Sequence, residues 1–300
     1  MIGIILSAAC VSAAEDVGQT DIGDTSNMDA NGDILAISSG ENEILGAGEP
    51  GTFTELQELI ENNTGSDPLN LTKDYKWSSE FTDYAIKIKN PITINGNGHT
   101  IDASNEYRKR IFEIDDVNSG IILDNITFKN GNSDAHGGAI NIISALSDSK
   151  FTNLNFINNT AVNNGGAVRF YSTSKNNLFE NVTFIDNTAT QGNGGALYIT
   201  KTSTSDIFNN VRFENNRAEI DDGGAINFHG KVDGLTFTNA TLYKNRAEKR
   251  VGGAINIDAG IENSIFNNTH FIDNSAKTGG AIGITYKNND IKSLTFGFVR

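Results

Sequence analysis

Apolar and polar residues alternate in short runs along most of the chain. Ile140-Asn141-Ile142 is one such run, and Val182-Thr183-Phe184 is another. A period of two places the apolar side chains on one face of a strand, whereas a helix would need a period of 3.6. Clusters of Gly, Asn, Asp and Ser separate the runs, as turns require. The pattern therefore predicts an all-β protein built from short strands.

The runs belong to an internal repeat. Gly-Gly-Ala recurs at intervals of 28, 29, 29, 29 and 27 residues, with its first glycine at Gly137, Gly165, Gly194, Gly223, Gly252 and Gly279. An aromatic follows each of the first five glycines by 14 residues, at Phe151, Phe179, Phe208, Phe237 and Phe266. Two residues further on stands an asparagine, at Asn153, Asn181, Asn210, Asn239 and Asn268. A period of this length indicates a solenoid.

The strand pattern selects among solenoids. Tetratricopeptide and ankyrin repeats are helical, and the frame of a leucine-rich repeat is absent. We predict a single-stranded right-handed parallel β-helix, in which each coil of about 28–29 residues holds three strands and three turns. Equivalent residues of successive coils would then stack about 4.8 Å apart.

Stacking gives the repeated residue types a role. The Phe columns would fill a dry interior, and asparagine columns would form hydrogen-bonded ladders along the axis. We expect Asn125, Asn181 and Asn239 to lie in an internal ladder of this kind. The paired glycines are expected where the backbone has a positive φ or where coils approach closely.

The two ends differ from the repeats. We expect residues 1–14 to be a signal peptide, since a short apolar stretch precedes Ser12-Ala13-Ala14. Removing it would also remove Cys10, the single cysteine. Residues 15–50 hold nine acidic residues and no Lys or Arg, which predicts a disordered acidic linker. Subtracting those nine from the net charge of −14 leaves −5, and no basic face favours nucleic acid.

We divide the remainder into two parts. Residues 51–120 should form a capping helix, over residues 52–63 with a capping box of Thr54 and Gln57, and the first irregular coils. Residues 121–300 should form the regular coils. No later stretch reaches the ~18 consecutive apolar residues of a membrane span. The C-terminal coil has no cap, so either it is left open or the chain is part of a longer product, and we favour the second.

These motifs resemble a known family. Gly-Gly-Ala followed by Ile, Val or Leu, alternating with Phe-x-x-Asn, resembles the repeat of chlamydial-type polymorphic outer membrane proteins (Pmp). It is similar also to adhesin-like proteins of methanogenic archaea, together with the segment from Pro91 to Asp102. The resemblance covers residues 51–300. It implies a β-helix, a secreted protein at the cell surface, and binding to glycans or proteins of another cell.

Many β-helices act on polysaccharides, so an enzyme is the rival class. Glycosidases need two carboxylates that face one substrate. The candidates are Asp115-Asp116 and Asp221-Asp222, with Arg212 and Lys244 on nearby faces, but a solvated turn explains Asp221-Asp222 better. We therefore expect no catalytic residues and no cofactor. The four histidines lack metal-ligand spacing; they are His99, His136, His229 and His270.

Two kinds of surface site remain. Asn62 and Asn70 begin glycosylation sequons outside the repeat, and both are candidate acceptors. Arg169 and Tyr198 fall in one outward column on adjacent coils, where an aromatic beside an arginine could stack on a sugar. The favoured hypothesis is a surface adhesin. A secreted polysaccharide lyase or hydrolase and a passive stalk of a longer surface protein are the alternatives.

Overall fold

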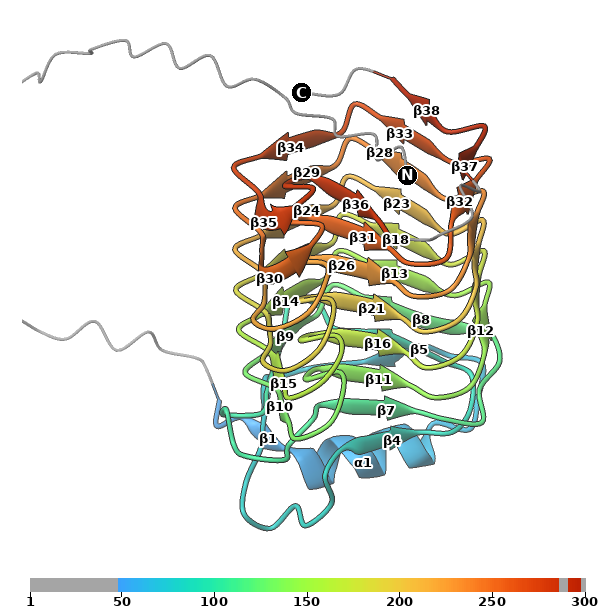
Figure 1. The fold of residues 1–300 in the computed structure, drawn as a ribbon. Coiled ribbons are helices and arrows are strands. Elements are labelled where there is room, and N and C mark those ends of the chain that lie inside the picture. The colour runs from blue at the N-terminus through green and yellow to red at the C-terminus, as the bar shows by residue number, and fades with distance from the viewer. Residues whose placement is uncertain (1–47, 286–290, 298–300) are drawn as a thin grey trace, which may run out of the picture.

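The computed structural model describes residues 48–285 and 291–297. The expected signal peptide, all but the last three residues of the acidic linker, and the C-terminal Arg300 lie outside these residues. The described chain is a parallel β-solenoid in which every strand of one coil pairs with the equivalent strands of the coils before and after it (Figure 1). It thereby confirms the parallel β-helix that the repeat predicts.

Three sheets hold most of the longer strands. Sheet A contains β1 (Gly51–Thr52), β3 (Tyr75–Lys76), β6 (Thr100–Asp102), β9 (Thr127–Lys129), β14 (Asn155–Ile157), β19 (Thr183–Ile185), β24 (Arg212–Glu214), β29 (Thr241–Tyr243) and β34 (His270–Ile272). Sheet B contains β2 (Leu69–Asn70), β5 (Ile92–Asn95), β8 (Ile121–Asp124), β13 (Lys150–Thr152), β18 (Leu178–Glu180), β23 (Ile207–Asn209), β28 (Thr236–Thr238), β33 (Ile265–Asn267) and β38 (Thr295–Phe296). Sheet C contains β4 (Ile86–Ile88), β7 (Phe112–Ile114), β11 (Ile140–Ile142), β16 (Val168–Phe170), β21 (Leu197–Ile199), β26 (Ile226–Phe228), β31 (Ile255–Ile257) and β36 (Ile282–Ile284).

Two further sheets occupy places where the sequence predicts only turns. Sheet D contains β10 (Asn132–Ser133), β15 (Thr160–Ala161), β20 (Thr188–Ala189), β25 (Arg217–Ala218), β30 (Arg246–Val251) and β35 (Ser275–Thr278). Sheet E contains β12 (Leu146–Ser147), β17 (Ser174–Lys175), β22 (Ser203–Thr204), β27 (Val232–Asp233), β32 (Ile261–Glu262) and β37 (Ile291–Lys292). A full coil therefore has five strands rather than the expected three, because the same stacking that pairs the long strands also brings two corner segments into register.

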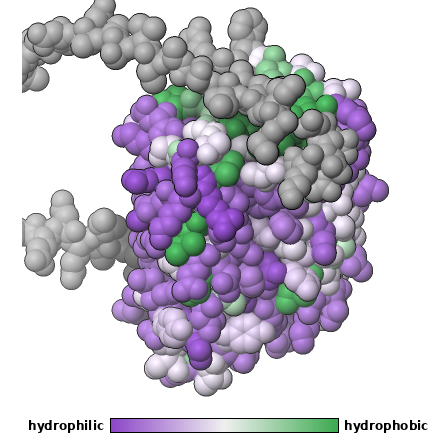
Figure 2. All heavy atoms as spheres, in the orientation of Figure 1, coloured by the Kyte–Doolittle hydropathy of each residue, from purple (hydrophilic) through white to green (hydrophobic). Residues whose placement is uncertain are grey.

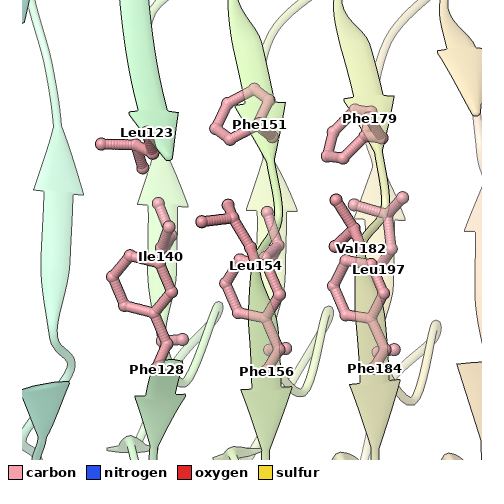
Figure 3. Packing of buried hydrophobic residues seen from close by; sticks show 14 of the residues in the cluster. Leu123, Phe128, Ile140, Phe151, Leu154, Phe156, Phe179, Val182, Phe184 and Leu197 are labelled. Atoms are coloured by element: carbon pink, nitrogen blue, oxygen red, sulfur yellow. The ribbon is translucent and has the colours of Figure 1, made fainter. Parts of the chain in front are cut away.

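The interior consists of stacked side chains from sheets A, B and C (Figure 3). In sheet B the ring of Phe208 lies 4.6 Å from that of Phe179 and 4.6 Å from that of Phe237, with nearly parallel planes. A second stack runs through sheet A, where Phe184 lies 4.7 Å from Phe156. Figure 3 shows Phe156, Phe179 and Phe184 of these stacks pointing into the space that the sheets enclose. The columns confirm the predicted dry core.

Asparagines form two separate ladders along the solenoid axis. The ladder that the sequence analysis expects to be internal is the exposed one. Asn181 and its equivalents lie at an exposed corner with φ near 50°, and the Asn181 Nδ2 donates to Asn153 Oδ1 at 3.0 Å. Asn125 and Asn239 are exposed in the same way, so their expected place in an internal ladder is wrong. Asparagine occupies this corner because its short polar side chain tolerates the left-handed conformation.

The internal ladder is the column six residues further along, and we name it the buried ladder. Its four fully buried members are Asn159, Asn187, Asn216 and Asn245. The Oδ1 of Asn187 accepts from both the backbone and the side-chain nitrogen of Asn159, each at 3.0 Å, while its Nδ2 donates to the Phe156 carbonyl. Each member thus satisfies polar groups on its own and the neighbouring coil.

The two glycines of Gly-Gly-Ala have different roles. The first has a positive φ, such as 68° at Gly165 and 73° at Gly223, which favours a residue without a Cβ. The second has no room for one, because a Cβ on Gly166 would collide with the carbonyl oxygen of Gly195 in the next coil. Both of the reasons expected from the sequence therefore apply, one to each glycine.

One helix, α1 (Phe53–Asn62), lies across the N-terminal end of the solenoid (Figure 1). It buries Phe53, Leu56 and Ile60 in the core. The capping helix is confirmed, but its capping box is formed by Thr52 and Glu55 instead of Thr54 and Gln57, since the helix begins one residue after Thr52.

Candidate functional site

A column of polar residues runs along the outer side of sheet C. Each strand of this sheet points its first and last residues inward, so the middle residue faces away from the core. These middle residues stack in register, and we name them the outer column: Lys87, Glu113, Asn141, Arg169, Tyr198, Asn227, Asn256 and Gly283. The face on which these strands lie in Figure 1 is largely hydrophilic in Figure 2.

From Glu113 to Gly283 the outer column is buried although it faces away from the core. Arg169 exposes 9% of its surface and Tyr198 exposes 4%, so the expectation that both are open surface residues is wrong. The segments between sheets D and C turn back over sheet C and bring the first glycine of each Gly-Gly-Ala against the column. A Cβ on Gly165 would lie 3.3 Å from the Cβ of Arg169, and one on Gly223 would lie 2.9 Å from that of Asn227.

The N-terminal end of the outer column holds a closed ionic network. Glu113 pairs with Lys87 and, at 2.9 Å, with Arg110. Arg110, which exposes 6%, also donates to Ser133 Oγ and to the carbonyl oxygens of His136 and Gly137. Burial disfavours the charged form of Glu113, but its hydrogen bonds and the nearby cations outweigh burial and lower its pKa.

The centre of the column is different, because Arg169 has no carboxylate partner among the described residues. Its Nε is buried without a hydrogen-bond acceptor there, and the Oδ1 of Asn141 in the preceding coil is buried without a donor. The guanidinium carbon lies 4.5 Å from the ring centre of Tyr171, which is half exposed. Burial lowers the pKa of Arg169, as expected for a cation that lacks a counter-charge.

His136 lies near the same centre, in the segment between β10 and β11. Its Nδ1 accepts the backbone N–H of Asn164 at 3.2 Å. Burial, reinforced by Arg169 and Arg110, lowers the pKa of His136 to about 4. The imidazole is therefore neutral at physiological pH, with its proton on Nε2.

The C-terminal end of the column opens into a hollow of about 790 Å³. Asp258 organises it: one carboxylate oxygen accepts from Asn256 and Thr285, and the other accepts from Asn227 and lies 2.9 Å from His229 Nδ1. The His229 ring lies 6.2 Å from that of Tyr198. Sequence reasoning treated His229 alone and missed Asp258, because the two residues are 29 positions apart and only the coil period relates them.

Asp221 and Asp222 line the same hollow, and Asp115 and Asp116 do not. Asp221 pairs with Arg250 at 3.0 Å, and Asp222 accepts the backbone N–H of Val251 at 2.8 Å. Burial raises the pKa of Asp222, and Asp258 and Asp221 add to the rise.

The lysine and arginine residues that line the hollow are Lys249, Arg250 and Lys277 rather than the expected Arg212 and Lys244. Arg212 lies on sheet A, where it pairs with Glu214 and lines a second hollow of about 370 Å³ beside the exposed asparagine corner.

The remaining candidates are dispersed. Within the described residues no group of three or more His, Cys, Asp or Glu could hold a metal ion, and no helix there is long and apolar enough to cross a membrane. Asn62 is exposed at the end of α1. Asn70 is also exposed, and its side chain bonds to the Pro68 carbonyl and to Asn95.

The chain resembles known proteins over one short segment. A family model for the Chlamydia polymorphic membrane protein (Pmp) repeat matches residues 181–200, which span one exposed corner asparagine, β19, β20 and the following Gly-Gly-Ala. No curated protein and no solved structure matches the chain. The matched segment supports a Pmp-type repeat on a parallel β-solenoid.

Proposed function

We propose that this chain is a secreted, adhesin-like repeat protein of the cell surface that binds glycans or proteins of another cell through the face of sheet C that carries the outer column and the hollow at its end. One observation carries the proposal: the interior columns repeat almost the same residue in every coil, whereas the outer column changes residue at almost every coil. A passive stalk has no need of such variety. Binding sites set on a rigid scaffold do need it.

The Pmp-type repeat supports the cell-surface location, since the matched family is named for membrane proteins of Chlamydia.

The carboxylates of the hollow favour binding without bond cleavage. Both oxygens of Asp258 are engaged by side chains of the protein, and Asp221 and Asp222 are each held by a partner. A glycosidase needs one carboxyl that donates a proton and a second that attacks or activates water. Carboxylates that are held by such hydrogen bonds and ion pairs suit a binding surface better than catalysis. We therefore propose that the protein is not an enzyme.

The test is retention of purified residues 15–300 on immobilised polysaccharides and on whole cells, with the soluble fraction examined for shortened polysaccharide chains. We expect selective retention without shortening. Asp258→Asn should reduce retention because it weakens the contact with His229, whereas Arg212→Gln, on sheet A, should not. Shortened chains would show an enzyme, and absence of retention on every surface would favour the stalk.

A further inference from the structure

Arg169 differs from Arg110, the deeply buried arginine that pairs with Glu113 of the outer column, and the difference shows which partner Arg169 lacks. Arg110 and Arg169 are both more than nine-tenths buried. Arg110 has a carboxylate at 2.9 Å, a hydroxyl and two carbonyl oxygens. Arg169 has none of these among the described residues, and its Nε is buried without an acceptor.

Burying a cation without a counter-charge is costly, and proteins normally avoid it by pairing. Among the described residues no carboxylate forms an ion pair with Arg169, and the like charge of Arg110 disfavours its charged form. Glu113 is already shared between Lys87 and Arg110, so it leaves this part of the column with excess positive charge. The protein therefore supplies a cation here and no anion.

The guanidinium group of Arg169 also lies beside an exposed aromatic ring. Its central carbon lies 4.5 Å from the ring centre of Tyr171, a cation–π contact that leaves half of the tyrosine exposed. Among the described residues no hydrogen bond or ion pair engages the guanidinium group, and the 9% of Arg169 that stays exposed lies on the same face as that half-exposed ring. An arginine fork matches a carboxylate in geometry as well as charge.

The neighbouring groups add neutral hydrogen-bonding capacity rather than further charge. The Oδ1 of Asn141 is a buried acceptor without a donor. His136 is held by its Nδ1 contact with the Asn164 N–H, which leaves its Nε2–H as a donor. The environment thus combines a cation, an exposed aromatic ring, one unused acceptor and one unused donor. It suits a sugar that carries both a carboxylate and hydroxyl groups.

We propose that Arg169 is the anchor of a binding site for the carboxylate of an acidic saccharide, whose ring packs beside Tyr171. The proposal rests on the proposed function for its biological meaning, because it names the class of glycan. The site itself is defined by Arg169 and can be tested without cells. Acidic saccharides should therefore be bound in preference to their neutral equivalents.

The experiment is a titration of the purified protein, labelled with ¹⁵N at arginine, with galacturonate, galactose and acetate. The Nε–Hε resonance of Arg169, assigned by its loss in Arg169→Met, should shift with galacturonate in a saturable way. Galactose should leave it unchanged, and acetate should shift it only at much higher concentration. A thermal melt of Arg169→Met shows whether the variant is folded.

Calorimetry with oligogalacturonate supplies the second measurement. Arg169→Met should weaken binding at least about tenfold, the effect of losing one charge-assisted contact, and Arg212→Gln should bind like the parent. An unmoved resonance, an equal response to galactose, or unchanged affinity in Arg169→Met would overturn the proposal. An acetate response as strong as that of galacturonate would overturn the saccharide part and leave an adventitious ion only.

These outcomes are separable from those of the cell-retention test. Retention on cells together with no galacturonate response would contradict the Arg169 site and leave adhesion intact. A galacturonate response with no retention on any cell or polysaccharide would leave the site and contradict adhesion.

Discussion

The inside of the solenoid and the outer column of sheet C obey different rules, although the same strands contribute to both. Inside, each coil repeats its predecessor, and the stacked Phe rings and the buried ladder satisfy one another along the axis. Outside, the column changes from an ion pair to an unpaired arginine and then to a tyrosine and asparagines. Regularity therefore marks the residues that build the fold, whereas the irregular outer column carries the proposed binding site.

Buried polar atoms without a hydrogen-bond partner also distinguish the outer column from the buried ladder. Seven buried side-chain atoms lack a partner within the described residues, and three of them belong to the outer column: Asn141 Oδ1, Arg169 Nε and Asn256 Oδ1. None belongs to the buried ladder in that part of the chain. An unpaired buried group costs about 1–3 kcal/mol, so the outer column carries a cost that the interior avoids.

The largest expected effect comes from breaking the aromatic stack. Phe208→Ala should lower the free energy of unfolding by about 3–5 kcal/mol, because it removes a ring packed between two others and leaves a cavity. Ile207→Ala, at the adjacent and 42% exposed position, should cost less than about 1 kcal/mol. Urea unfolding measures both, and equal losses would contradict a core formed by the Phe column.

A slightly smaller loss should follow from interrupting the buried ladder. Asn187→Ala removes the acceptor of the Asn159 backbone N–H and the donor to the Phe156 carbonyl, which should cost about 2–4 kcal/mol. Asn155→Ala, on the exposed side of β14, should change stability by less than about 0.5 kcal/mol. A comparable loss at both positions in urea unfolding would show that burial does not distinguish them.

One interior position should gain from substitution. Asp206 is fully buried, and burial raises its pKa above the ordinary 3.8. The fold therefore binds the proton more tightly than the unfolded chain does, so the stabilising effect of protonation is complete below pH 3.8 and is lost as the pH rises through the raised value. Asn177, the equivalent residue one coil earlier, shows that an asparagine fits this column.

Asp206→Asn should accordingly raise Tm by about 2–4 °C at pH 7. At pH 3 the gain should largely disappear, because Asp206 is then protonated. Thermal melts at the two pH values provide the measurement. A variant that is less stable than the parent at pH 7 would mean that the carboxylate charge itself contributes to the fold.

The smallest effect on stability is expected at Arg169. Arg169→Met should lose no more than about 0.5 kcal/mol, because it removes a cation that has no counter-charge. Arg110→Met is the matched substitution and should cost about 3–5 kcal/mol, since it leaves Glu113 buried with one partner fewer. A large loss in Arg169→Met would show that Arg169 has a structural partner and would weaken the comparison with Arg110.

The repeated features could be predicted from the sequence because each depends on stacking identical residues. The coil length, the Phe columns and the paired glycines follow directly from the period. The inner asparagine could also have been identified. Asn159 follows Phe156 by three residues, as the inward Leu154 follows Phe151, and this spacing places both on the inner side of a corner. Asn153 follows Phe151 by two residues instead of three, and it lies on the exposed side of the corner.

The outer column could not be predicted as a buried site. Alternation alone shows that Arg169 and Tyr198 face away from the core, and an outward residue is ordinarily exposed. Their burial depends on the segments that precede Gly-Gly-Ala and turn back over sheet C. The length and path of those segments differ among coils, and the sequence gives no period from which to derive them. The hydrogen bonds around Asp258 were missed for a different reason, because His229 and Asp258 lie 29 positions apart and only the coil period relates them.

The contact between second glycines has a consequence for how such a chain can change over generations. Because Gly166 meets Gly195 as Gly195 meets Gly224, the junctions between the coils that carry Gly-Gly-Ala have nearly the same shape. A duplication or deletion of 28 or 29 residues would therefore join two compatible surfaces and leave the interior intact, while each coil added would lengthen the rod by about 4.8 Å. Such a duplication or deletion would also place each residue of the outer column beside new neighbours. Recombination between coils could therefore produce new binding surfaces while the chain still folds, whereas most substitutions risk a loss of folding.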